Sequence, residues 1–200
     1  MPKITPEGIF VDGRIIVRRY LNLEHGPIST VVAIVLHQTD SSTAQQTFNS
    51  YARSPHGAHF LIDKNGQVYQ TASLLMRCQH VGRHIRSRCL EIDKPSCDSV
   101  AMARIQAMSW SNHVRALDAH ERAKPYPQRY PINGDSIGIE IVGRSIDDKK
   151  YEAVTSEQNN SLQWLTGELY SHFSISSQDV YRHPEVSYKN PGEAASAVPK

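Results

Sequence analysis

The sequence predicts one α/β domain in which helices flank a central mixed β-sheet. Its 200 residues fit a single domain with one hydrophobic core, over residues 1–200. Segments with strand-like and helix-like hydrophobic patterns are interspersed along the chain, which favours helices packed on a sheet. Residues 31–36 are apolar at every position, which is typical of a strand buried on both faces.

The N-terminal part, residues 1–30, is expected to form an extension before this strand. Residues 10–17 carry apolar side chains on either side of Asp12-Gly13. Because Asp-Gly favours tight turns, this pattern predicts a small hairpin.

A helix and a second hairpin are expected after the buried strand. Ser-Ser-Thr at 41–43 offers N-caps for a helix that continues to about residue 52. Residues 59–63 and 67–70 flank Asn65-Gly66, which predicts a hairpin with a type I′ turn because Asn and Gly both accept positive φ.

The second half of the chain holds a long polar segment, a strand and a helix. We expect residues 83–134 to be an insertion near the substrate groove, with one helix from residue 98 to about 123. Residues 136–142 predict a strand that is apolar at nearly every position except Glu140. Residues 156–173 predict a helix with one apolar stripe.

Composition narrows the functional classes. The net charge of +2 and the aromatic fraction of 8% give little support for nucleic-acid binding. No run approaches the ~18 apolar residues of a membrane span. The first residues also lack the apolar core of a signal peptide. We therefore expect either a cytoplasmic protein or one exported by a route that does not read such a signal.

The three cysteines leave two possibilities open. The cysteines are Cys78, Cys89 and Cys97. No two of them form a Cys-x-x-Cys motif, which argues against a structural zinc knuckle. They are either free thiols or, in an oxidising compartment, Cys89 and Cys97 form a disulfide around a short loop.

Three polar residues stand where a reactive site is expected. His37 follows the buried strand, at the end of a sheet where side chains point into a cleft. His183 precedes a proline after the last long helix. Each histidine alone also fits a purely structural role. Glu140 lies among apolar residues, so it is either a solvent-facing edge residue or a partly desolvated general base.

Five segments together resemble the type 2 N-acetylmuramoyl-L-alanine amidases, which include phage endolysins and peptidoglycan recognition proteins. They occur in the order found in that family and cover most of residues 31–195. The segments are 35–39 (Val-Leu-His-Gln-Thr), 58–66 (Ala-His-Phe-Leu-Ile-Asp-Lys-Asn-Gly), 80–82 (His-Val-Gly), 135–143 (Asp-Ser-Ile-Gly-Ile-Glu-Ile-Val-Gly) and 182–189 (Arg-His-Pro-Glu-Val-Ser-Tyr-Lys).

The resemblance implies a Zn²⁺ ion held by two histidines and a third ligand, with one position left for water. The matching histidines are His37 and His183. Family members place cysteine or aspartate eight to ten residues after the second histidine, and this chain departs from that pattern. Glu193 supplies an oxygen donor at this distance and is our candidate, although a different third ligand or none stays open.

The same resemblance implies a mechanism and a substrate. Glu140 corresponds to the family's glutamate and would act as general base, and Lys189 would stabilise the oxyanion. The expected reaction cleaves the lactyl amide between N-acetylmuramic acid and L-alanine in peptidoglycan or muropeptides. His80, His84 and Arg182 are candidate substrate contacts, Arg182 because guanidinium groups match carboxylates.

Two questions stay open from the sequence. The departure at the third ligand also fits a non-catalytic peptidoglycan-binding module of the same fold. An enzyme could recycle wall fragments, act as an endolysin, or be an antibacterial effector that works in the periplasm of a target cell. We favour the effector, which would have an immunity protein as a partner.

Overall fold

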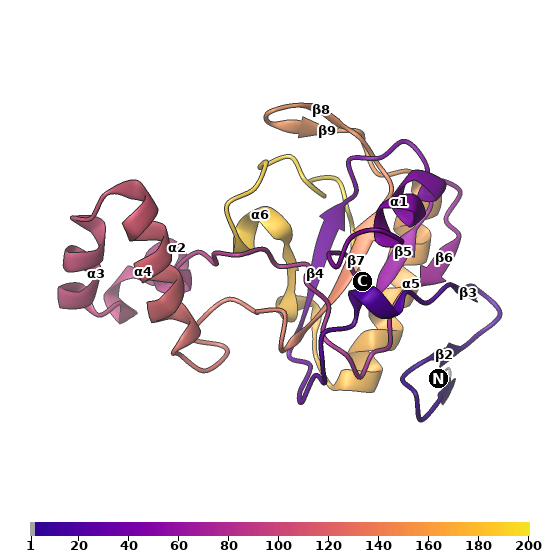
Figure 1. Ribbon diagram of the computed structural model, residues 1–200, viewed down its shortest axis with the longest axis horizontal. Coiled ribbons are helices and arrows are strands. Elements are labelled where there is room, and N and C mark those ends of the chain that lie inside the picture. The colour runs from indigo at the N-terminus through magenta and orange to yellow at the C-terminus, as the bar shows by residue number, and fades with distance from the viewer. Residues whose placement is uncertain (1–2) are drawn as a thin grey trace.

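A six-stranded mixed sheet organises the computed structural model, which describes residues 3–200. The spatial order is β10–β4–β7–β5–β6–β3, with the bounds Val180–Arg182, Ala33–Gln38, Ser136–Ile141, Phe60–Ile62, Val68–Gln70 and Ile15–Val17. The first four strands are parallel to their neighbours, β6 is antiparallel to β5, and β3 is parallel to β6 (Figure 1). The predicted mixed sheet flanked by helices is therefore confirmed.

Helix α5 (Ser156–Phe173) covers one face of the sheet, with the bounds that the sequence predicts. Thr155 and Gln158 form a capping box that starts the helix by satisfying backbone N–H groups. The apolar stripe of α5 packs on alternate strand residues. Side chains that recur every 3.6 residues in the helix and every 2 residues in the strands therefore form one core. The buried residues of this core include Leu162, Leu165, Leu169, Ile34, Leu36, Ile137, Ile139 and Ile141.

The opposite face of the sheet carries helix α1 (Ala44–Tyr51) and the short helix α6 (His183–Val186). Thr43 caps α1 by accepting a hydrogen bond from the backbone of Gln46. In α1, Phe48 packs against Leu61 of β5. Because strand side chains alternate, the residues of β4 and β7 that do not face α5 point to this second face.

The expected hairpin at residues 10–17 is wrong. β2 (Phe10–Val11) pairs with β1 (Lys3–Ile4), while β3 continues to the edge of the main sheet. There β3 runs parallel to β6, which buries Ile15 in the main core. The open edge of β6 thus receives a partner from a distant segment, a pairing that a local Asp-Gly signal does not encode.

The hairpin of β5 and β6 forms as predicted, but its turn is not type I′. Asn65 does not have positive φ; Gly66 does, at 84°. The Gly66 N–H donates to the carbonyl of Asp63, as in a tight turn followed by a left-handed glycine. The glycine also lies against α5, where a Cβ would come within 2.8 Å of the carbonyl oxygen of Glu157. Tertiary packing therefore selects the turn.

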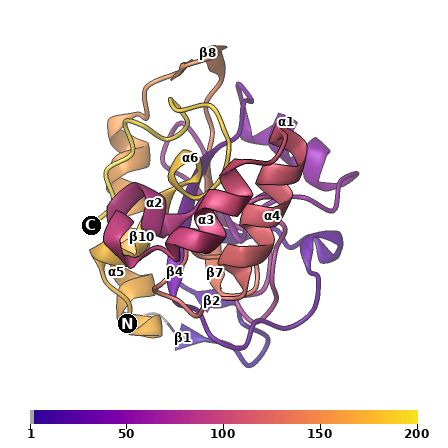
Figure 2. The ribbon, with the colours of Figure 1, turned by 90° about the vertical axis from the view of Figure 1, so that its left-hand side faces the viewer.

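Residues 83–134 fold into three helices instead of the expected single one. They are α2 (Arg88–Ile92), α3 (Ser99–Gln106) and α4 (Trp110–Arg122), and α3 and α4 lie beside the sheet-based body of the molecule (Figures 1 and 2). The chain reverses between α3 and α4, which lets Met102 and Ile105 pack on Leu117 in a separate small core. Cys89 and Cys97 form a disulfide beside it.

The remaining elements are short. They are the two-stranded sheet of β8 (Ser145–Asp147) and β9 (Lys150–Tyr151), and the 3-10 helices at Leu21–Leu23, Lys94–Ser96 and Ser177–Asp179. No helix within residues 3–200 combines the length and hydropathy needed to cross a membrane.

Candidate metal centre and active-site pocket

Three polar side chains meet at the carboxyl ends of neighbouring parallel strands. His37 of β4 and Glu140 of β7 are direct register partners, and both belong to the face opposite α5. His183 is the first residue of α6, immediately after β10, which pairs with β4 on the other side. Ligand sites of open parallel sheets commonly occur at this edge.

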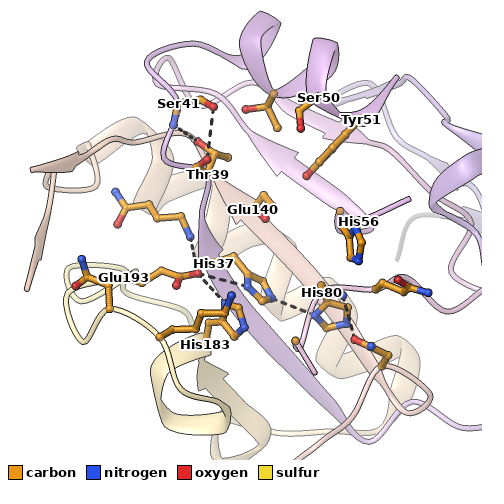
Figure 3. A pocket seen from close by; sticks show the side chains of 18 of the residues that line it. His37, Thr39, Ser41, Ser50, Tyr51, His56, His80, Glu140, His183 and Glu193 are labelled. Atoms are coloured by element: carbon orange, nitrogen blue, oxygen red, sulfur yellow. Dashed lines mark hydrogen bonds and ion pairs between the residues drawn. The ribbon is translucent and has the colours of Figure 1, made fainter. Parts of the chain in front are cut away.

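Glu193 reaches the same point from the loop near the C-terminus (Figure 3). Its Oε1 lies 2.9 Å from Nδ1 of His183 and 3.5 Å from Nδ1 of His37. One ligand atom from each of these three side chains lies within 4.8 Å of the others, and all three residues are buried. The structure thus brings together the three residues that the sequence proposed as ligands.

Hydrogen bonds assign the tautomer of each histidine. Nε2 of His183 lies 3.1 Å from the Val81 carbonyl, which only accepts, so this nitrogen carries a proton. Nε2 of His80 likewise faces the Ser136 carbonyl at 3.3 Å. Neutral His80 therefore accepts at Nδ1 from Nε2 of His37, at 3.0 Å. In neutral His37 and His183, the lone pairs of Nδ1 consequently point toward Glu193.

This donor set fits a divalent cation. Burial lowers the pKa of His37 to about 4, and the nearby His183 adds to that shift, so the His37 imidazole is neutral. Burial opposes ionisation of Glu193, but the two imidazoles beside it, His183 first and then His37, outweigh burial and lower the pKa of Glu193 to about 2. The Nδ1 lone pairs of His37 and His183 converge with the carboxylate of Glu193. A single proton could link only two of these three groups, whereas a metal ion can bind all three. A tetrahedral zinc, with ligands at ~2.0–2.2 Å, suits such a mixed N and O set.

His80 lies one step behind His37. The residue is 6% exposed, and both of its ring nitrogens are engaged with protein groups. The ring packs so closely on β7 that a Cβ at Gly138 would lie 2.8 Å from two of its atoms. Gly138 therefore leaves the space in which His80 contacts His37. His80 also lines the pocket, so the substrate contact that we expected for it stays a prediction beside its support of His37.

Glu140 lies beside this cluster with one carboxylate oxygen in an unusual state. Oε2 is buried and has no hydrogen-bond partner among residues 3–200. Burial raises the pKa of Glu140 to about 8, the charge of Glu193 raises it further, and Lys189 lowers it. A carboxyl group with this pKa exchanges protons near neutral pH, as a general base must.

The surrounding pocket has a volume of about 870 Å³. Its walls include Lys189 beside the metal candidates, but neither His84 nor Arg182. Arg182 instead pairs with Glu185, at 2.8 Å. The pocket also contains residues that the sequence patterns did not single out, because each depends on a long-range contact. These are Thr47 and Tyr51 of α1, together with Arg83, Arg122 and Asn133 from the segment 83–134.

Fold and site together define a class of protein. Two histidines, an acidic side chain and a nearby buried glutamate at the ends of parallel strands are typical of metal-dependent hydrolases. A family model described as N-acetylmuramoyl-L-alanine amidase matches residues 27–193. The chain belongs to this family of peptidoglycan amidases.

Solved structures of amidases share the fold at low sequence identity. The catalytic domain of XlyA has 20% identity and a TM-score of 0.53, over 88% of this chain and 87% of that chain. AmpDh3 from Pseudomonas aeruginosa, in complex with anhydromuramic pentapeptide, has 17% identity and a TM-score of 0.52, over 78% and 52%. No curated protein sequence gives a significant match.

Proposed function

We propose that this amidase is zinc-dependent and hydrolyses the lactyl amide that joins N-acetylmuramic acid to L-alanine. The observation that carries the proposal is the convergence of one ligand atom each from His37, His183 and Glu193 beside the buried Glu140. A similar fold binds anhydromuramic pentapeptide in AmpDh3, which supports peptidoglycan fragments as substrates.

In this proposal His37, His183 and Glu193 hold the ion, and the Val81 carbonyl and His80 orient the two imidazoles from behind. When bound by these residues, a zinc ion would supply Lewis-acid chemistry, polarising the substrate carbonyl and making water more acidic. Glu140 accepts a proton from the attacking water and passes it to the leaving nitrogen. The carbon–nitrogen bond breaks, and the products are a lactyl carboxylate and the free amine of L-alanine.

Lys189 is the proposed partner of the developing oxyanion. It lines the pocket next to the metal candidates, and its positive charge favours the ionised form of Glu140. One cation can therefore stabilise both the ground-state base and the negative oxygen of the transition state.

The test is metal analysis of purified protein, with mass spectrometry of digested sacculi for wild type and Glu140→Gln. We expect about one zinc per chain in both proteins, and stem peptides released only by wild type. Zinc with no released peptides from wild type would favour the alternative, a peptidoglycan-binding module. Equal release by Glu140→Gln would exclude the glutamate as the base.

We also propose that the enzyme works in an oxidising compartment. Disulfides such as Cys89–Cys97 persist in the bacterial periplasm and are rare in the cytosol. This favours an effector that acts in the periplasm of a competitor, with an immunity protein protecting the producer, over an enzyme that recycles wall fragments in the cytoplasm. An endolysin that reaches the periplasm fits the same observation.

A further inference from the structure

Two hydroxyl groups of α1 line the pocket without a hydrogen-bond partner in the described part of the chain. They are Oγ1 of Thr47 and the phenol oxygen of Tyr51, and each residue is only 4% exposed. The two residues are four positions apart, so they lie on the same face of the helix. Burying a polar group without a partner is unfavourable, and a bound ligand would supply the missing partner.

Packing fixes the position of Tyr51. Its ring contacts the ring of Tyr20, with centroids 5.8 Å apart. On another side it lies so near the backbone that a Cβ at Gly57 would come within 2.7 Å of it. Figure 3 shows the Tyr51 hydroxyl pointing into the pocket, toward Glu140. Burial first, and then the charge of Glu140, raises the pKa of Tyr51 well above its usual value, against the backbone N–H of Ala58, which lowers it. The hydroxyl therefore keeps its proton, and this proton is free to be donated to a ligand.

The unpartnered oxygen of Glu140 faces the same pocket. Glu140 lies between the metal candidates on one side and Tyr51 on the other (Figure 3). If Glu140 protonates the leaving amine, as proposed above, then the peptide that begins at this amine extends away from the metal centre. This direction leads along α1.

We propose that Thr47 and Tyr51 form a subsite for the stem peptide, in which their hydroxyls donate hydrogen bonds to peptide carbonyl oxygens. The assignment rests on the proposed function for the direction of the substrate. Hydroxyl donors match carbonyl acceptors, and the peptide supplies such acceptors next to the scissile bond.

The test uses Tyr51→Phe and Thr47→Val, which remove a hydroxyl with little change of shape. The probes are a muramoyl tripeptide for kinetics and the free stem tripeptide for calorimetry. We expect each variant to lower kcat/KM, and the affinity for the free tripeptide, by about 2- to 10-fold, as for one lost neutral hydrogen bond. The matched control is Tyr20→Phe, whose ring contacts Tyr51 without lining the pocket, and we expect no change there.

The outcomes separate the subsite from the reaction. If wild type cleaves the substrate and both variants equal it in kinetics and tripeptide affinity, the subsite is wrong and the amidase proposal stands. If wild type binds the tripeptide without cleaving any substrate, and both variants bind it more weakly, the subsite stands and the amidase proposal fails. A loss of zinc in the variants in proportion to their loss of affinity would also overturn the subsite, because the hydroxyls would then support the metal centre.

Discussion

At the scale of single residues, Glu140 shows how function and stability oppose each other. The reaction needs its ionised form, but burial favours the protonated form and raises the pKa from 4.5 to about 8. Between these two values the folded protein holds a proton that the unfolded chain has released. The contribution of Glu140 to stability is therefore greatest below about pH 4.5 and falls as pH rises toward 8.

Glu140→Gln should remove this dependence. We expect the metal-free variant to melt a few degrees above metal-free wild type at pH 8, and at nearly the same temperature near pH 4.5, because glutamine resembles the protonated acid. Thermal unfolding after chelator treatment at both pH values measures the difference. A variant that melts below wild type at pH 8 would show that the buried carboxylate is stabilised by a partner.

At the scale of elements, β7 supports the metal centre through the absence of a side chain. Gly138 makes room for the His80 ring. Nδ1 of His80 in turn accepts a hydrogen bond from Nε2–H of His37, which fixes the tautomer of His37. The glycine in this sequence motif is therefore needed for steric reasons. They become apparent only when β7 and the segment that contains His80 are packed together.

Gly138→Ala should therefore weaken metal binding. The new Cβ would displace the His80 ring, with a loss of ~1–3 kcal/mol in stability for overpacking. Losing the partner of a ligating histidine typically weakens metal affinity about 10- to 100-fold. Gly134→Ala is the matched control, because its Cβ would meet only one atom, at 3.9 Å. Chelator competition for zinc measures both; equal affinities would exclude this role for Gly138.

At the scale of the whole molecule, residues 83–134 combine a small core of their own with direct contributions to the pocket. Asn133 accepts hydrogen bonds from the backbone of His80 and Val81, the two residues behind the candidate metal ligands. The disulfide lies at the other end of this region, beside α2 and α3. Reduction is therefore expected to loosen the helices before it disturbs the metal centre.

Replacing both cysteines, Cys89→Ser with Cys97→Ser, should lower stability by about 2–3 kcal/mol, as expected for opening a short loop. We expect the zinc content to stay unchanged, because the bond lies outside the pocket. Calorimetry and metal analysis test both statements. The compartment proposal has its own check: thiol alkylation of protein recovered from the periplasm of a target cell should find Cys78 free and the other two bonded. Three free thiols would contradict it.

Much of the architecture was predictable because it is encoded locally. The apolar run of β4, the capped stripe of α5 and the paired segments of β5 and β6 carry their periodicity in neighbouring residues. The resemblance to the amidase family also predicted His37, Glu140 and His183 as site residues, in this order along the chain. The errors occurred where distant segments decide the outcome: the pairing of β3, the turn at Gly66, and the break between α3 and α4.

The sequence by itself therefore determined the strands and helices of the core and the kinds of chemical groups available at their ends. Only the tertiary structure decided which groups meet. It joined Glu193 to His183 and His37, placed His80 behind a ligand, and left the hydroxyls of Thr47 and Tyr51 facing the pocket. Periodicity and caps act over a few residues, whereas proton sharing and unsatisfied polar groups depend on atoms that long-range packing brings within about 3 Å.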